Sequence, residues 1–162
     1  MRNIRSFRMA FARFLAARLE IAMEYSALIA DHETIDRLTQ HLLKLVRSGN
    51  SRPETAAQVL DMLAMAIRDH LATADPIIHA TAAAANGARH EPAARASVAE
   101  LDMLREDWAQ YLYRWDAPRI MANWDDFSEE TSVVLRRVSD SVNRETAVLY
   151  SLAVHYDVIQ AG

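Results

Sequence analysis

The stretch SGNSRPE at residues 48–54 holds the clearest chain reversal in the sequence, and it decides how the segments on either side are arranged. Gly49 is typical of a residue just past a helix C-terminus, and Ser51 is typical of an N-cap that is followed by Pro and Glu in the first helical turn. The stretch therefore predicts a tight turn between a helix at 24–48 and a second helix at 53–85, which would lie antiparallel to each other.

The rest of the chain is also rich in helix formers. Its 162 residues include 3 glycines and 4 prolines, and no run of β-branched or aromatic residues bounded by turn signals predicts a strand. Two further helices are expected at 92–115 and 126–157, and the segment between them is compatible with a short helix across the end of the others. The expected fold is all-α, an antiparallel up-down-up-down four-helix bundle over residues 24–157 with an extra N-terminal amphipathic helix at 1–23.

The N-terminal segment at 1–23 differs from the rest of the chain in its charge. It holds five arginines and no acidic residue before Glu20, and its apolar residues recur at helical spacing. We expect this basic helix to pack on the bundle or on a second copy of the chain, which would make a homodimer. Contact with a membrane surface is one alternative, and an organelle-targeting presequence is another.

Net charge and cysteine content indicate which partners and which cellular compartment to expect. The formal net charge is −4, which argues against a nucleic-acid partner because phosphate binding needs concentrated lysine and arginine. The lack of cysteine excludes disulfides and thiolate metal ligands and agrees with a reducing cytoplasm, which is the expected location. No stretch of 18 apolar residues predicts a membrane span.

Ionisable residues fall on or beside the stripes that helical spacing turns toward the interior. They are His32 in the first bundle helix, His70 in the second, Glu145 in the last, and Asp107 on the shoulder of the third. His32 and His70 are about equally far from the first turn, and His70 and Asp107 are about equally far from the second, so these three are expected at one depth. Glu145 misses this depth by about 15 Å unless the segment at 116–126 folds back along the bundle.

A polar group that is buried without a partner costs several kcal/mol, so these side chains admit two interpretations. One is a hydrogen-bonded core network, such as His70 with Glu145, that needs no ion. The other is a metal site, because two neutral imidazoles and a carboxylate that converge from separate helices are suitable ligands for a first-row transition metal.

Four segments resemble a known family. They are IADHETIDRLTQHL at 29–42, AIRDHLATAD at 66–75, LREDWAQYL at 104–112 and LRRVSDSVNRETAVLY at 135–150. Together they are similar to the hemerythrin-like (HHE) cation-binding bundles over about residues 24–153. In that family a His on the first helix, a His-x-x-x-Glu on the second, a His on the third and a His-x-x-x-Glu on the fourth hold two irons bridged by carboxylates. The resemblance implies that His32, His70 and Glu145 occupy ligand positions.

The chain departs from the family pattern at the other ligand positions. Ala74 stands where the glutamate of the second helix belongs, and Ser141 replaces the histidine of the fourth. On the third helix, either Asp107 or Trp108 takes the place of the histidine, depending on the register. The resemblance therefore implies a reduced ligand set in place of a standard diiron centre.

The function expected from this reduced set is sensing or regulation linked to a non-haem metal, dioxygen or redox state, and not catalysis. His32, His70 and Glu145, with Asp107 as a fourth candidate ligand, would hold one or two ions, iron or another divalent transition metal. The alternative is a metal-free helical interaction module, a homodimer, in which Trp108 fills the vacated ligand position with apolar volume. No catalytic residue is expected.

Overall fold

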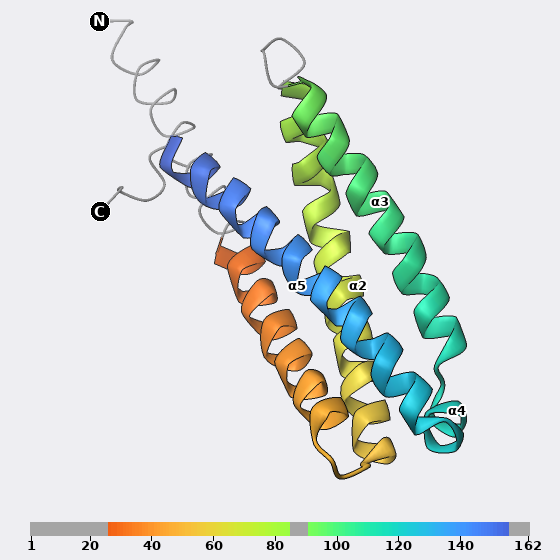
Figure 1. Cartoon of the computed structure of the whole chain (residues 1–162). Helices are drawn as coiled ribbons and strands as arrows, with labels where there is room; N and C mark the ends of the chain where they lie inside the picture. Colours follow the sequence, from red (N-terminus) through yellow and green to blue (C-terminus); the bar gives the residue numbers. More distant parts are fainter. Residues whose placement is uncertain (1–25, 85–90, 156–162) are drawn as a thin grey trace, which may run out of the picture.

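The computed structural model describes residues 26–84 and 91–155, with the side chains of 26–73 and 102–147. Within these ranges the chain is helical and contains no strand, so the predicted all-α class is confirmed. The described part of the first helix covers residues 26–47. It is followed by α2 (Pro53–Ala84), α3 (Glu91–Arg114), α4 (Ala117–Ala122) and α5 (Trp124–His155), as Figure 1 shows. The predicted helix at 1–23 lies outside the described residues.

The turn between the first helix and α2 lies where the sequence predicts it. The Ser48 backbone N–H donates to Lys44 O at 3.0 Å, and the Ser48 hydroxyl lies 2.8 Å from Leu45 O and 3.1 Å from Asn50 O. These contacts satisfy carbonyls that the helix end would otherwise leave without a partner. Because α2 begins at Pro53, only a few residues separate the two helices, and they lie side by side in Figure 1.

The segment that the sequence left ambiguous folds as the short helix α4. The Asp116 side chain caps it by accepting the Arg119 backbone N–H at 2.9 Å, and Pro118 stands in the first turn, where its missing N–H costs nothing. The Arg119 guanidinium donates to Tyr113 O and Arg114 O, so it also closes the C-terminal end of α3. In Figure 1, α4 crosses the end of the molecule that also holds the 48–53 turn, and it contacts α2 and α5.

The hydrophobic core at this end of the molecule includes four aromatic side chains, which are called the aromatic core below. Trp108 stacks on Tyr111 at a ring-centroid distance of 5.4 Å, and Trp115 meets Phe127 edge-on at 5.3 Å. The exposed fractions of these four side chains are between 0% and 8%, so all four lie in the interior. Burial of this aromatic surface contributes to the driving force for folding.

Two polar groups of this aromatic core, the Tyr111 hydroxyl and the Trp115 indole N–H, have hydrogen-bond partners on α5. The Tyr111 hydroxyl lies 2.6 Å from Thr131 Oγ1 on α5, and burial raises the pKa of Tyr111 far above its ordinary value of 10, so the hydroxyl stays neutral. The Trp115 indole N–H donates to Glu130 Oε2 at 2.8 Å, and Arg114 pairs with Glu130 Oε1 at 2.7 Å. These contacts fix α3 against α5 without a buried charge that lacks a partner.

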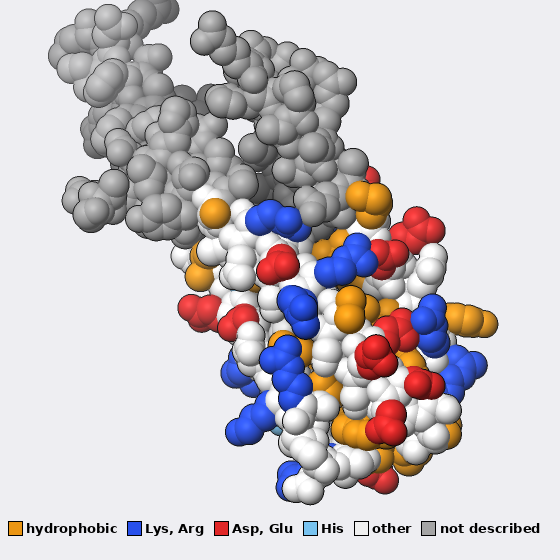
Figure 2. Space-filling view, in the orientation of Figure 1, with side chains coloured by type: hydrophobic (Ala, Val, Ile, Leu, Met, Phe, Trp, Pro, Cys, Tyr) orange, Lys and Arg blue, Asp and Glu red, His pale blue; other side chains and the backbone are white. Residues whose placement is uncertain are grey.

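The surface carries mixed charge. Figure 2 shows basic and acidic side chains interspersed over the visible face, with hydrophobic side chains between them. In the part of the chain that the structure describes, no helix has the length and apolar character needed to cross a membrane.

Tyr111→Phe is expected to lower the free energy of unfolding by about 1–3 kcal/mol, because the buried Thr131 hydroxyl would lose its partner. Urea unfolding measures the change. The double variant Tyr111→Phe/Thr131→Val is expected to lose less than the sum of the two single variants, since both polar groups then leave the core. An unchanged free energy of unfolding in Tyr111→Phe would contradict this account.

Candidate metal centre

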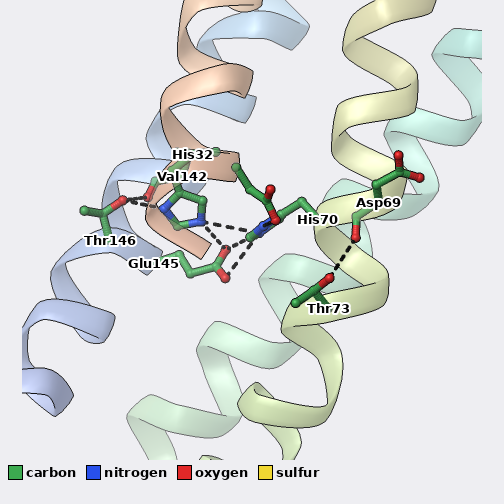
Figure 3. A network of polar contacts seen from close by, with 8 residues as sticks. His32, Asp69, His70, Thr73, Val142, Glu145 and Thr146 are labelled. Atoms are coloured by element: carbon green, nitrogen blue, oxygen red, sulfur yellow. Dashed lines mark hydrogen bonds and ion pairs between the residues drawn. The ribbon is translucent and has the colours of Figure 1, made fainter. Parts of the chain in front are cut away.

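Three of the four predicted ligands come together between three helices. His32 on the first helix and His70 on α2 are 4% and 3% exposed, and the Glu145 side chain on α5 is 15% exposed. One ligand atom from each of these residues lies within 4.8 Å of the others. Figure 3 shows the two imidazoles and the carboxylate pointing toward one another. The prediction that His32 and His70 face the interior at one depth agrees with the structure, whereas Glu145, which residue spacing placed about 15 Å away, joins them.

The position of α4 explains why Glu145 reaches this depth. Because α5 begins at Trp124, at the end of the molecule that also holds the 48–53 turn, Glu145 and His70 are both far along their helices from the same end. The difference in depth of about 15 Å expected from the sequence was a difference between Glu145 and Asp107 of α3, counted from the connection between their helices. The relevant comparison is with the histidines of the first helix and α2.

Asp107 lies away from the cluster. Its carboxylate pairs with Arg137, which stands eight residues before Glu145 on α5, or about 12 Å along the helix. Asp107 is only seven residues from the end of α3 at Arg114. It therefore lies near the α4 end of the molecule, at the level of Arg137. The structure therefore does not bring Asp107 to the other three candidate ligands.

Three further residues stand at ligand positions of the hemerythrin-like family pattern. Trp108 is buried in the aromatic core against Tyr111, so it contributes apolar volume. Ser141 on α5 is partly buried. The side chain of Ala74, which stands at the position of the second-helix glutamate in the family pattern, lies outside the described residues.

The donor separations fit a single small ion. His32 Nε2 lies 3.4 Å from His70 Nε2, and Glu145 Oε2 lies 3.3 Å from His70 Nε2 and 3.7 Å from His32 Nε2. Around a four-coordinate first-row ion, metal–donor distances of about 2.0–2.2 Å place neighbouring donors about 3.3–3.6 Å apart. Glu145 Oε1 is buried and makes no hydrogen bond, so the carboxylate keeps capacity to accept a cation.

Two further residues contact the back of the imidazoles, and sequence reasoning missed both. Thr146 Oγ1 lies 2.7 Å from His32 Nδ1, and the Thr146 hydroxyl donates to Val142 O at 2.8 Å. Asp31 Oδ2 lies 3.6 Å from His70 Nδ1. Each is the sequence neighbour of a predicted ligand, which is the signal that could have drawn attention to it.

In the metal-free chain, His70 and Glu145 each shift the pKa of the other toward its charged form. Burial acts to lower the pKa of His70, but the hydrogen bond and charge of Glu145, together with Asp31, raise it above the ordinary 6.5. Burial acts to raise the pKa of Glu145, but hydrogen bonds from His32 and His70 and the charge of His70 lower it from 4.5 to about 2. The lowered pKa of Glu145 adds stability above pH 4.5, and the raised pKa of His70 adds stability below pH 6.5.

The contribution of the pair of His70 and Glu145 is therefore expected to be greatest between pH 4.5 and 6.5 in protein treated with a chelator. Glu145→Gln is expected to lower the free energy of unfolding in this window by on the order of 3 kcal/mol, because a buried imidazolium would lose its partner. The difference between parent and variant should shrink as the pH falls toward 2 and as it rises through the pKa of His70. A difference that stays constant from pH 3 to 9 in urea unfolding would contradict this coupling.

Comparison with known proteins leaves the family of this chain open. No protein-family model, no curated protein and no solved structure matches the sequence. The likeness to the hemerythrin-like bundles thus rests on the four segments quoted above, and the function has to be argued from the geometry of His32, His70 and Glu145.

Proposed function

We propose that this protein is a hemerythrin-like four-helix bundle that holds one divalent first-row transition metal ion and acts in sensing or regulation. The observation that carries the proposal is the convergence of the His32, His70 and Glu145 donor atoms at separations of 3.3–3.7 Å from three helices. The up-down-up-down arrangement is supported by the tight turn at 48–53 and by α4, which returns the chain from α3 to α5.

The donor set indicates the class of ion. Two imidazoles and one carboxylate suit iron, zinc and related ions and do not suit magnesium or calcium, which prefer oxygen ligands alone. Iron is the ion that the family resemblance implies. When bound, such an ion would supply Lewis acidity and positions open to a small exogenous ligand such as dioxygen. His32, His70 and Glu145 would hold it, and the burial of these side chains would limit access of water.

The location of the three ligands supports regulation over turnover. Each comes from a different helix, so an ion bound by all three stabilises one arrangement of those helices relative to any other. Metal occupancy, or a change in the oxidation state of the ion, is thereby coupled to the packing of the bundle. A coupling of this kind is what a sensor needs to pass a signal to a partner.

A second candidate function is favoured by one observation, which is that each residue of the cluster has a polar partner without an ion. His32 has Thr146 as a partner, and His70 pairs with Glu145. The chain would then be a metal-free interaction module, a homodimer that assembles through residues 1–23. Neither proposal includes a nucleic-acid partner, because the net charge of −4 argues against phosphate binding.

Elemental analysis of protein purified without a histidine tag separates the two candidates. The parent is expected to carry close to one transition metal ion per chain, and His32→Ala is expected to fall well below that ratio because it removes one of three ligands. His41→Ala is the matched control, since His41 lies exposed on the same helix and should leave the ratio unchanged. Equal trace amounts of metal in the parent and in His32→Ala would overturn the metal-binding proposal.

Deletion of residues 2–20 tests the interaction module. The mass in solution is expected to fall from that of a dimer to that of a monomer if these residues form the contact. A mass that does not change on deletion would contradict assembly through this segment.

A further inference from the structure

The His32, His70 and Glu145 cluster has an outer layer that follows a reciprocal pattern. Asp31 is the neighbour of His32 on the first helix, yet its carboxylate faces His70 of α2 at 3.6 Å. Thr146 is the neighbour of Glu145 on α5, yet its hydroxyl contacts His32 of the first helix at 2.7 Å. Each of these two adjacent pairs therefore contributes one candidate ligand and one contact to a histidine of another helix.

The contact with Thr146 determines which nitrogen of His32 carries the proton. The Thr146 hydroxyl donates its hydrogen to Val142 O at 2.8 Å, so its oxygen is left to accept from His32 Nδ1. His32 Nδ1 must then carry the hydrogen, and in the neutral ring Nε2 carries the lone pair. Figure 3 shows this chain from Val142 through Thr146 to His32, with the opposite side of the ring turned to Glu145 and His70. The lone pair thus points at the proposed metal position.

Asp31 has the corresponding place behind His70. His70 Nδ1 is buried and makes no hydrogen bond, and Asp31 Oδ2 lies 3.6 Å from it. Without an ion, Glu145 Oε2 at 3.3 Å accepts a hydrogen from His70 Nε2. With an ion bound on the Nε2 side, the hydrogen of the neutral ring would stand on Nδ1, where the Asp31 carboxylate faces it and raises the basicity of Nε2. The Asp31 side chain is 39% exposed, so its carboxylate can make this approach without a large cost of desolvation. His70 Nε2 is then the nitrogen that faces His32 and Glu145.

We propose that Thr146 and Asp31 are positioning residues of the metal centre, and that they set both imidazoles to present Nε2 to one ion. The inference rests on the proposed function, because it assigns to these residues an effect on metal affinity. Outer partners of metal-bound histidines commonly change metal affinity by roughly 10-fold to 100-fold. Thr146 and Asp31 are expected to act in this range.

Cobalt(II) is a suitable probe because it binds to zinc-type sites and absorbs visible light when bound. Thr146→Val keeps the shape of the side chain and removes the hydroxyl, and it is expected to weaken cobalt binding by roughly 10-fold to 100-fold. Thr146→Ser restores the hydroxyl and is expected to bind cobalt as the parent does. Thr73→Val on α2 is the matched control, since its hydroxyl donates to Asp69 O at an exposed position.

The role of Asp31 is tested in the same titration. Asp31→Asn removes the charge behind His70 and is expected to weaken cobalt binding by about tenfold. Asp69→Asn is its control, because Asp69 adjoins His70 in sequence but is exposed and pairs with Arg68. Parent-like affinity in both Thr146→Val and Asp31→Asn would overturn the inference.

The tautomer of His32 can be measured in chelator-treated protein, which tests the role of Thr146 even where a variant is less stable. Nitrogen-15 NMR of the histidine rings at pH 8 is expected to show the hydrogen of His32 on Nδ1 in the parent and in Thr146→Ser, and a shift toward the other tautomer in Thr146→Val. The same tautomer in all three proteins would overturn the assignment. If the parent binds no cobalt, the metal-binding proposal itself fails; if the parent binds cobalt and the variants match it, only the role of Thr146 and Asp31 fails.

Discussion

Two imidazoles and a carboxylate that are removed from water must find partners, and this constraint organises the middle of the molecule. An isolated buried charge would destabilise the fold by several kcal/mol, whereas a mutual arrangement of His32, His70 and Glu145 offsets that cost. The three side chains can meet only if the first helix, α2 and α5 keep one relative register. A polar cluster of this kind therefore specifies how three helices align, which apolar stripes alone do not.

The sequence predicts much of this arrangement, because helix boundaries and inward stripes are local properties. Gly49 and Ser51 place the first turn, and the spacing around His32 and His70 turns both rings inward. Residue spacing does not predict depth across a connection of unknown shape. Asp107 was expected at the level of His70, but it pairs with Arg137, and α4 is the reason that α5 starts where it does.

The sequence also does not predict which side chains of different helices contact each other. Asp31 and Thr146 stand beside predicted ligands, but nothing in the spacing of one helix tells which residue of another helix they face. Such contacts depend on the rotation of each helix about its axis, which the packing of the whole core decides. The hemerythrin-like resemblance indicates ligand positions but does not indicate that Asp31 and Thr146 contact the histidines.

The aromatic core formed by Trp108, Tyr111, Trp115 and Phe127 is made of residues other than the three candidate ligands. Much of the apolar packing is thus independent of the ligand set. A scaffold organised in this way can tolerate change where its chemistry resides: substitutions can remove, exchange or restore donors during evolution while the protein still folds.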